Sequence, residues 1–435
     1  MQGIENKFWR FALPSMLSQL LNSFFIIVDG FFIGQNLGDV GLAAINVAWP
    51  LVVVLQASAL AIGTGGAVRL ATAVGEGDIP KALQVRGNTI SMLAVASVVL
   101  GTAMLFSYPY LLPLIGANEE LYPLAAEYIR VECMMAVFQI FTTGLLPLLR
   151  GAGRSITAMV LMVMGLFSNI YLDWLFIHHY HWGLPGAAFA TGLSQAMCAV
   201  LSLPILLAHK GWALRLSQFK LSGKLVKGIL HYGISPFGLS LSTSVIILFA
   251  NLRALRYGGT GGVAAYAVLS YILGSVIPLI TGVGDGIQPL LSNARGAGNL
   301  PAMHRLRRKG LLLAVGASLA CSVLCQAWRF KLPELFGAGE ATSGMVAGAM
   351  WTLSVAFPFM AMVRFCCSYF CAVGQPMASS ILAYGEPLAA QPFFLLVLPL
   401  FMELAGVWVS YPAAVAVMAG IALWLLHRQL HPEEA

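Results

Sequence analysis

The sequence repeats itself at a fixed distance. Gly63-Thr-Gly65 and Gly75-Glu-Gly-Asp-Ile-Pro80 recur as Gly284-Asp-Gly286 and Gly296-Ala-Gly-Asn-Leu-Pro301, each displaced by 221 residues. The same displacement relates Gly153 to Gly374, and Ala43-Ala44 to Ala264-Ala265. Matches at one offset over such a length predict two halves with the same order of helices and turns.

Composition decides the class of protein. Of 435 residues, 24 are Lys or Arg and 17 are Asp or Glu, so that 9% are charged, while 59% are hydrophobic. The mean hydropathy is +0.83. A soluble protein carries about 25% charged residues. We therefore expect an all-α polytopic membrane protein and exclude disulfide-stapled secreted scaffolds, disordered chains and nucleic-acid binders.

The apolar runs predict twelve membrane-spanning helices. Each span needs about 20 apolar residues. Residues 155–208 are long enough for two helices with a turn between them. The other ten expected helices lie near 11–34, 42–68, 87–118, 124–149, 228–252, 257–294, 310–328, 341–363, 376–401 and 404–426.

Six helices in each half bring both halves across the membrane in the same direction. Their pseudo-two-fold axis should then run along the membrane normal. We expect an N-terminal lobe over 1–209, a linker over 210–227 and a C-terminal lobe over 228–435. If the N-terminus is cytoplasmic, 18 Lys and Arg residues lie inside and 4 lie outside, and this bias predicts that both termini are cytoplasmic. A prokaryotic inner membrane is the expected location.

Four polar residues in the N-terminal half are expected at one depth, in the outer half of the membrane. They are Asp29, Asn169, Asp173 and Thr191. Asn169 and Asp173 are four residues apart and so share a helix face. Carboxylate, amide and hydroxyl oxygens suit a small cation such as Na⁺, and a buried carboxyl group can also bind a proton. A structural polar network is the alternative, although two carboxylates without a basic partner would make a poor one.

The C-terminal half lacks this set. The 221-residue offset places Ala250, Ala390 and Phe394 opposite Asp29, Asn169 and Asp173. Ion coupling is therefore expected in one lobe. Asp285 is the exception in the second half, and it either binds a cationic substrate or caps and pairs near the cytoplasmic end.

Other polar residues fall inside the expected spans. We expect a substrate cavity lined by Gln19, Asn22, Ser194, Gln195 and Asp285. Arg364 and Glu386 should lie at one depth on adjacent helices, as a structural ion pair or as a gate that breaks during transport. Near the outer end of the expected helix 124–149, Glu127, Arg130 and Glu132 are expected to form an interfacial network.

These residues carry a resemblance to the multidrug and toxic compound extrusion (MATE) family over nearly the whole chain. The matching segments are Val28-Asp-Gly-Phe-Phe-Ile-Gly34, Asn169-Ile-Tyr-Leu-Asp173, Gly186-Ala-Ala-Phe-Ala-Thr191 and Gly284-Asp-Gly-Ile-Gln-Pro289. The resemblance implies two six-helix lobes that open alternately to either side. It also implies a cation site at Asp29, Asn169, Asp173 and Thr191, with a backbone carbonyl that would be that of Ala187.

The function expected from residues and resemblance together is antiport. The protein would export amphipathic organic cations in exchange for Na⁺ or H⁺, as a monomer in the bilayer and without a cofactor or nucleic-acid partner. The alternative is a flippase for lipid-linked oligosaccharides on the same fold. An enzyme is not expected, because no His-Glu-x-x-His, Gly-x-Ser-x-Gly or phosphate-binding loop is present.

Overall fold

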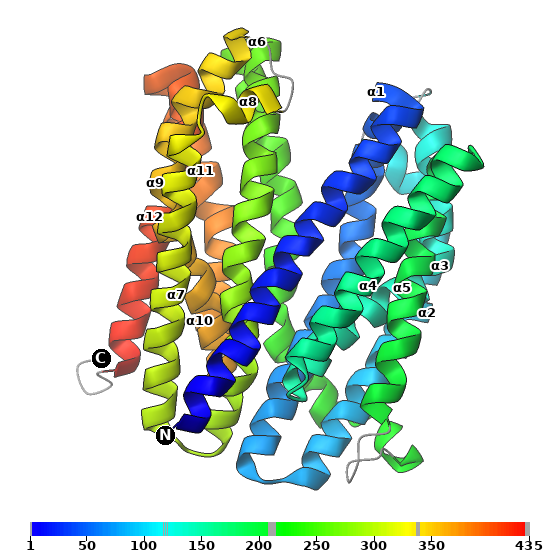
Figure 1. Ribbon diagram of the computed structural model, residues 1–435, viewed down its shortest axis with the longest axis vertical. Helices are drawn as coiled ribbons and strands as arrows, with labels where there is room; N and C mark the ends of the chain where they lie inside the picture. The colour runs from blue at the N-terminus through cyan, green and yellow to red at the C-terminus, as the bar shows by residue number, and fades with distance from the viewer. Residues whose placement is uncertain are drawn as a thin grey trace. The chain divides into compact units, whose positions relative to one another are not determined.

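The computed structural model describes residues 2–115, 117, 119, 121–207, 215–335 and 340–430, and these segments are helices joined by short turns (Figure 1). Apolar runs flanked by Gly and Pro form helices because hydrocarbon contains no water to satisfy an open backbone. The elements are α1 (Gln2–Glu76), α2 (Ile79–Ile115), α3 (Leu121–Gly151), α4 (Ser155–Asp173), η1 (Trp174–His179), α5 (Gly183–Leu207), η2 (Leu216–Phe219), α6 (Gly223–Gly296), α7 (Leu300–Ala327), α8 (Lys331–Leu335), α9 (Glu340–Ala372), α10 (Pro376–Gly385), η3 (Glu386–Ala390), α11 (Gln391–Val397) and α12 (Pro399–Leu430).

The chain is an all-α multi-pass membrane protein. Within the described residues, ten helical segments are long and apolar enough to cross a bilayer. The long elements α1 and α6 each contribute only their second part to that number, Ala43–Glu76 and Ala265–Gly296. A 75-residue helix is too long for one crossing, and Figure 1 shows α1 doubling back so that its second part runs opposite to its first. In α6 the break falls at Gly259, where φ is 59°. The first parts of α1 and α6 complete the twelve expected helices.

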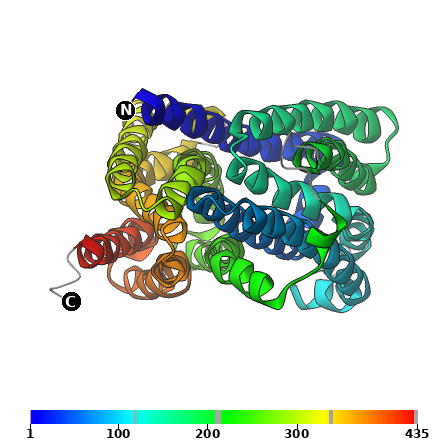
Figure 2. The same ribbon diagram turned by 90° about the horizontal axis from the view of Figure 1, so that it is seen from below.

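Packing between the helices defines two compact units. Unit 1 is Met1–Leu241 with Ser292–Asn299, and unit 2 is Ser242–Leu291 with Leu300–Ala435. In unit 1, α3 packs against α1, α2 and α5. In unit 2, α9 packs against α7, α10 and α12, and Figure 2 shows α12 in red beside the orange α10 and α11. The repeat-based boundaries 1–209, 210–227 and 228–435 stay a prediction.

Glycines let the helices of unit 1 approach closely. A Cβ on Gly63 of α1 would overlap the backbone of Gly144 in α3, and one on Gly192 of α5 would overlap Met135 in α3. Small residues at such crossings are typical of membrane proteins, where close van der Waals packing replaces the hydrophobic effect between helices. These crossings fix the heights at which polar side chains of α1, α3 and α5 meet.

One crossing in unit 1 follows the sequence repeat. A Cβ on Gly75 of α1 would overlap the carbonyl oxygen of Asn293, and a Cβ on Gly296 would overlap that of Thr72. Thr72 and Asn293, like Gly75 and Gly296, are 221 residues apart, so the contact is symmetric under the repeat.

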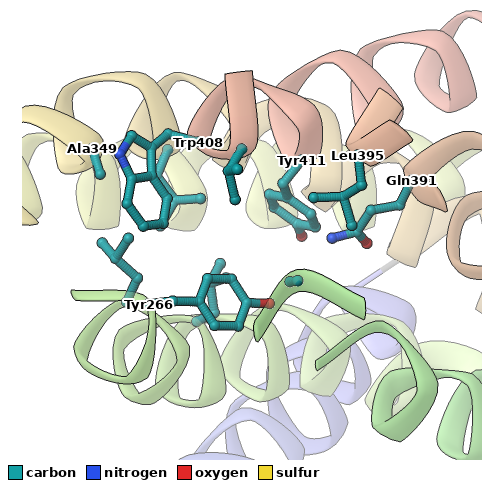
Figure 3. Close-up of a pocket in the computed structure, with 11 residues that line it drawn as sticks. Tyr266, Ala349, Gln391, Leu395, Trp408 and Tyr411 are labelled. Atoms are coloured by element: carbon teal, nitrogen blue, oxygen red, sulfur yellow. The ribbon is translucent and has the colours of Figure 1, made fainter. Parts of the chain in front are cut away.

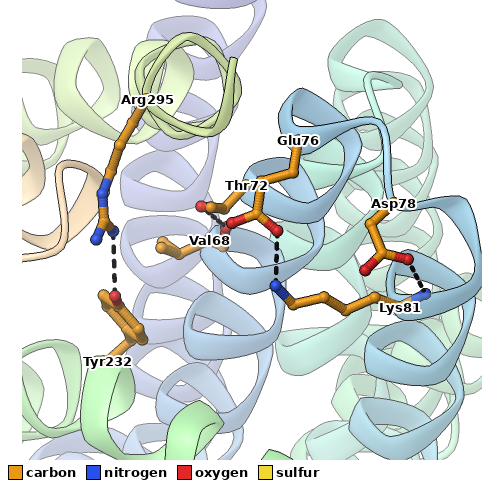
Figure 4. Close-up of polar contacts among 7 residues, drawn as sticks. All are labelled: Val68, Thr72, Glu76, Asp78, Lys81, Tyr232 and Arg295. Atoms are coloured by element: carbon orange, nitrogen blue, oxygen red, sulfur yellow. Dashed lines mark hydrogen bonds and ion pairs between the residues drawn. The ribbon is translucent and has the colours of Figure 1, made fainter. Parts of the chain in front are cut away.

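Polar contacts surround this crossing (Figure 4). Arg295 Nη1 donates to the Tyr232 hydroxyl at 3.1 Å, and the Lys81 backbone amide donates to Asp78 Oδ1 at 3.0 Å at the start of α2. Thr72 Oγ1 donates to the Val68 carbonyl oxygen at 2.8 Å, within α1. Lys81 and Glu76 form an exposed ion pair at 2.6 Å.

Candidate functional site

The helix α4 presents Asn169 and Asp173 on one face, one turn apart, as the i to i+4 spacing requires. Both side chains have 0% of their surface exposed. Directly after Asp173 the chain enters the π-helical turn η1, a feature that is frequent at functional sites. The last turn of α4 therefore holds two fully buried polar groups in an otherwise apolar helix.

The helix α5 supplies the opposite wall. Asn169 Nδ2 donates to Thr191 Oγ1 at 3.4 Å. Ala187 lies one turn before Thr191 and is buried. The structure thus brings Thr191 next to the pair on α4 and places Ala187 on the adjacent turn of the same helix.

Asp29 on α1 completes the arrangement. Its carboxylate interacts electrostatically with that of Asp173. Among the described residues, Asp29 Oδ1, Asn169 Oδ1 and both carboxylate oxygens of Asp173 are buried and have no hydrogen-bond partner. Leaving such oxygens unmatched costs about 1–3 kcal/mol each, and more when they are charged. These oxygens are therefore buried hydrogen-bond acceptors that no described donor satisfies.

A third carboxylate in this region escapes prediction from the sequence. Glu132 on α3 is 1% exposed, accepts a hydrogen bond from the Tyr128 hydroxyl and interacts electrostatically with Asp29. The expected interfacial network is wrong for this residue, because Glu127 and Arg130 are exposed while Glu132 points inward. The reason is the helix face: Glu132 lies four residues from Tyr128 and from Ala136, and both of these are buried. The apolar spacing of the sequence around it carries this signal.

A cavity of about 340 Å³ lies in unit 1. Four of the five residues expected in a substrate cavity line it, namely Gln19 and Asn22 on α1 and Ser194 and Gln195 on α5. The apolar wall includes Trp49, Met162 and Leu166, and the charged residue in the lining is Arg150. A cavity of this size suits a small amphipathic molecule.

Side-chain hydrogen bonds tie the cavity walls together. Thr142 Oγ1 on α3 donates to the Gln195 carbonyl oxygen on α5 at 2.7 Å. Cys198 Sγ donates to the Leu161 carbonyl oxygen on α4 at 3.2 Å, and Ser194 Oγ donates to that of Thr191 at 2.8 Å. The last contact links a cavity-lining residue directly to the turn that carries Thr191, so the cavity and the carboxylate cluster share α5.

Asp285 lies in unit 2, unlike the four cavity residues. It is half-buried and accepts a hydrogen bond from Ser368 Oγ at 3.4 Å. Its carboxylate is thus engaged within its own unit.

Arg364 and Glu386 form a buried ion pair in unit 2. Arg364 Nη2 lies 3.0 Å from Glu386 Oε1, and both side chains are almost fully buried. Glu386 opens the second π-helical turn, η3, which interrupts the helix between α10 and α11. Both π-turns therefore adjoin a buried carboxylate.

A small cavity of about 20 Å³ lies in unit 2 (Figure 3), with room for about one water molecule. Tyr266 and Trp408 stack across it with ring centres 6.5 Å apart. Its lining includes Ala250, Ala349 and Leu353. These are the residues 221 positions after Asp29, Tyr128 and Glu132. The two halves thus use equivalent positions for an acidic cluster in one and an uncharged cavity in the other.

The carboxylates of unit 1 offer hard oxygen ligands, but few of them to any one ion. In the part of the chain that the structure describes, no three His, Cys, Asp or Glu side chains converge closely enough to hold one metal ion. A monovalent cation held by one or two carboxylates and neutral oxygens fits this donor set better than a tightly bound divalent metal.

Two helical units in the membrane, a buried acidic cluster and an amphipathic cavity are together typical of a membrane transporter. Comparison with known proteins agrees. The family model MatE matches residues 14–175 and 234–385. The chain therefore belongs to the MatE family, and it is a transporter and not an enzyme.

Three known proteins illustrate the likeness. The multidrug export protein MepA of Staphylococcus haemolyticus is 24% identical over 96% of this chain and 92% of its own length. The probable multidrug resistance protein YoeA of Bacillus subtilis is 23% identical over 94% and 91%. A solved outward-facing structure of a multidrug resistance MATE transporter superimposes with a TM-score of 0.94 at 25% identity, covering 99% and 97% of the two chains.

Proposed function

We propose that the protein is an antiporter that exports amphipathic organic cations and related drugs in exchange for Na⁺ or H⁺. It acts as a monomer, by alternating access, with both termini in the cytoplasm. The names of its relatives, a multidrug export protein and a multidrug resistance protein, support this class of substrate.

The observation that carries the proposal is the set of unmatched oxygens on Asp29, Asn169 and Asp173. No ion pair of the described residues joins either carboxylate to a Lys or Arg, so two ionised carboxylates here would repel each other until a cation binds. Asp29, Asn169, Asp173, Thr191 and the Ala187 carbonyl are the coupling residues in this proposal. Na⁺ would take their oxygens as ligands, whereas H⁺ would occupy one carboxylate.

Coupling follows from the shared helices. Asp29 and the cavity residues Gln19 and Asn22 lie on the first part of α1, which contains Pro14. Neutralising Asp29 removes its repulsion from Asp173 and lets α1 repack against α4 and α5. Pro14 leaves one helical hydrogen bond unmade, so α1 can bend there. Repacking of α1 alters the cavity wall and releases the substrate.

The cavity lining bears on the choice of substrate. Gln19, Asn22 and Gln195 offer neutral dipoles, and Met162 and Trp49 offer a polarisable apolar wall. Within this lining Arg150 is the charged residue. A flippase for lipid-linked pyrophosphate would require several cationic side chains, so the oligosaccharide alternative is not favoured.

The test is efflux of a fluorescent organic cation from proteoliposomes, with a Na⁺ gradient and a pH gradient imposed separately. We expect one gradient to drive efflux and Asp29→Asn and Asp173→Asn to lower the rate at least tenfold. Asp78→Asn, at an exposed turn, is the control and should leave the rate unchanged. Native efflux rates in correctly inserted Asp29→Asn and Asp173→Asn proteins would refute the coupling role.

A further inference from the structure

The acidic cluster of unit 1 contains one carboxylate more than the proposed coupling set uses. Glu132 is as buried as Asp173, and its Oε1 has no hydrogen-bond partner among the described residues. The carboxylate of Glu132 accepts a hydrogen bond from the Tyr128 hydroxyl, one helical turn away on α3. A carboxylate this deep in a membrane helix is costly and functional by default.

Asp29 connects Glu132 with the rest of the cluster. It interacts electrostatically with Glu132 and with Asp173. No Lys or Arg forms an ion pair with any of the three carboxylates within the described ranges. Three carboxyl groups therefore share one buried region, and no ion pair of the described residues neutralises any of them.

One monovalent cation cannot neutralise all three carboxylates. The three carboxylates do not converge on a single point, since no three acidic side chains of the described chain are close enough to hold one metal ion. A single monovalent ion at Asp173 and Asn169 would leave Asp29 and Glu132 to be neutralised separately, because each uncompensated buried charge costs several kcal/mol. A second positive charge between Glu132 and Asp29 removes most of that cost.

The second half of the chain supports treating Glu132 as part of the site. Its equivalents of Asp29, Tyr128 and Glu132 are Ala250, Ala349 and Leu353, and all three line one cavity in unit 2. Positions that surround one space in unit 2 are expected to surround one space in unit 1, because the repeat gives both halves the same helix order.

An unmatched amide extends the polar face of α3. Gln139 lies two turns beyond Glu132 on the same face, and it is 2% exposed. Neither its nitrogen nor its oxygen has a hydrogen-bond partner among the described residues. Further along α3, Thr142 and Thr143 line the cavity. Such a buried amide requires water or a ligand, and it lies between Glu132 and the cavity.

We propose that Glu132 is a third carboxylate of the cation site and that unit 1 binds two monovalent coupling cations in each transport cycle. One cation lies with Asp173, Asn169 and Thr191, and the other lies with Glu132 and Tyr128, Asp29 being shared. This inference rests on the proposed antiport function and specifies its stoichiometry.

The experiment measures the substrate gradient that a cation gradient can hold. In proteoliposomes clamped at zero membrane potential, a tenfold gradient of the coupling cation should balance an ethidium gradient of about a hundredfold, because two cations enter for each dye molecule. Glu132→Gln should reduce the balanced gradient to about tenfold. Glu127→Gln, on the exposed side of the same helix, should retain the hundredfold value.

A binding measurement covers variants that insert but do not transport. Saturating ethidium added to purified protein should displace two coupling cations per dye bound, counted with radioactive Na⁺ or a pH indicator. Glu132→Gln should displace one, and Glu132→Asp, which keeps the charge, should displace two. A wild-type count of one overturns the proposal whatever the variants do, as does a count of two in Glu132→Gln. No ethidium gradient under either ion would instead refute antiport itself.

Discussion

At the scale of single residues, Arg364 and Glu386 form a buried pair of opposite charges in unit 2. Their atoms lie 3.0 Å apart with almost no exposed surface. Burying two charges costs nearly as much as their attraction returns. Removing one partner is different, because it leaves the other charge buried and unpaired.

Glu386→Gln should therefore lower the stability of the protein by about 3–5 kcal/mol. The measurement is the thermal unfolding midpoint of purified protein in detergent. Arg364→Met combined with Glu386→Met should recover most of the loss. Glu76→Gln is the control, since it breaks an ion pair whose side chains are more than one-third exposed and should change little. A Glu386→Gln protein with native stability but slow transport would contradict a structural role and favour a gate.

Helical spacing alone predicts some of the residue placements in unit 1. Asn169 and Asp173 share a face because they are four residues apart, and Thr191 on the next helix contacts Asn169. Glu132 is placed wrongly when it is grouped with the charged residues beside it in the sequence. Helical spacing puts it on the same face as the buried Tyr128 and Ala136.

At the scale of elements, the crossing of Gly75 with the segment around Gly296 sets how closely two helix ends approach. A methyl group on either glycine would overlap a backbone carbonyl oxygen, which cannot rotate away as a side chain can. The contact is symmetric under the repeat, so both glycines are subject to the same constraint.

Gly75→Ala and Gly296→Ala should each destabilise the protein by about 1–3 kcal/mol through overpacking, and by similar amounts. The thermal unfolding midpoint in detergent is the measurement. Gly316→Ala is the matched control, because a Cβ at this exposed helical glycine meets no neighbouring atom. It should be neutral or slightly stabilising. If neither substitution lowers the unfolding midpoint, or if only one does, the two helix ends can move apart without loss of stability and the constraint is not shared.

Elements could be predicted from the sequence to the extent that apolar length defines them. The expected span 124–149 corresponds to α3 within three residues, whereas α2 begins eight residues before the expected span 87–118 and ends three residues before its end. The π-helical turns η1 and η3 had no sequence signal, because one extra residue in a helical turn leaves the hydrophobic pattern almost unchanged. They matter to the site, since they adjoin Asp173 and Glu386.

At the scale of the whole molecule, the repeat predicts two related halves but not two equal functions. Equivalent positions hold Asp29 in one half and Ala250 in the other. A charged cluster in both halves would double the cost of burying carboxylates. The sequence could reveal this asymmetry because the offset assigns each residue its counterpart.

The placement of the whole chain across the membrane is the last prediction. Basic residues accumulate on the cytoplasmic side because translocating them is unfavourable, and the expected division is 18 inside against 4 outside. Lys331→Cys should then react with a membrane-impermeant maleimide in intact cells. Lys7→Cys and Lys224→Cys should react only after permeabilisation. All three lysines are exposed, whereas six of the seven native cysteines are buried, so the unsubstituted protein provides a low background. If Lys7→Cys is labelled in intact cells, the N-terminus lies outside, and both the predicted orientation and the predicted direction of export are wrong.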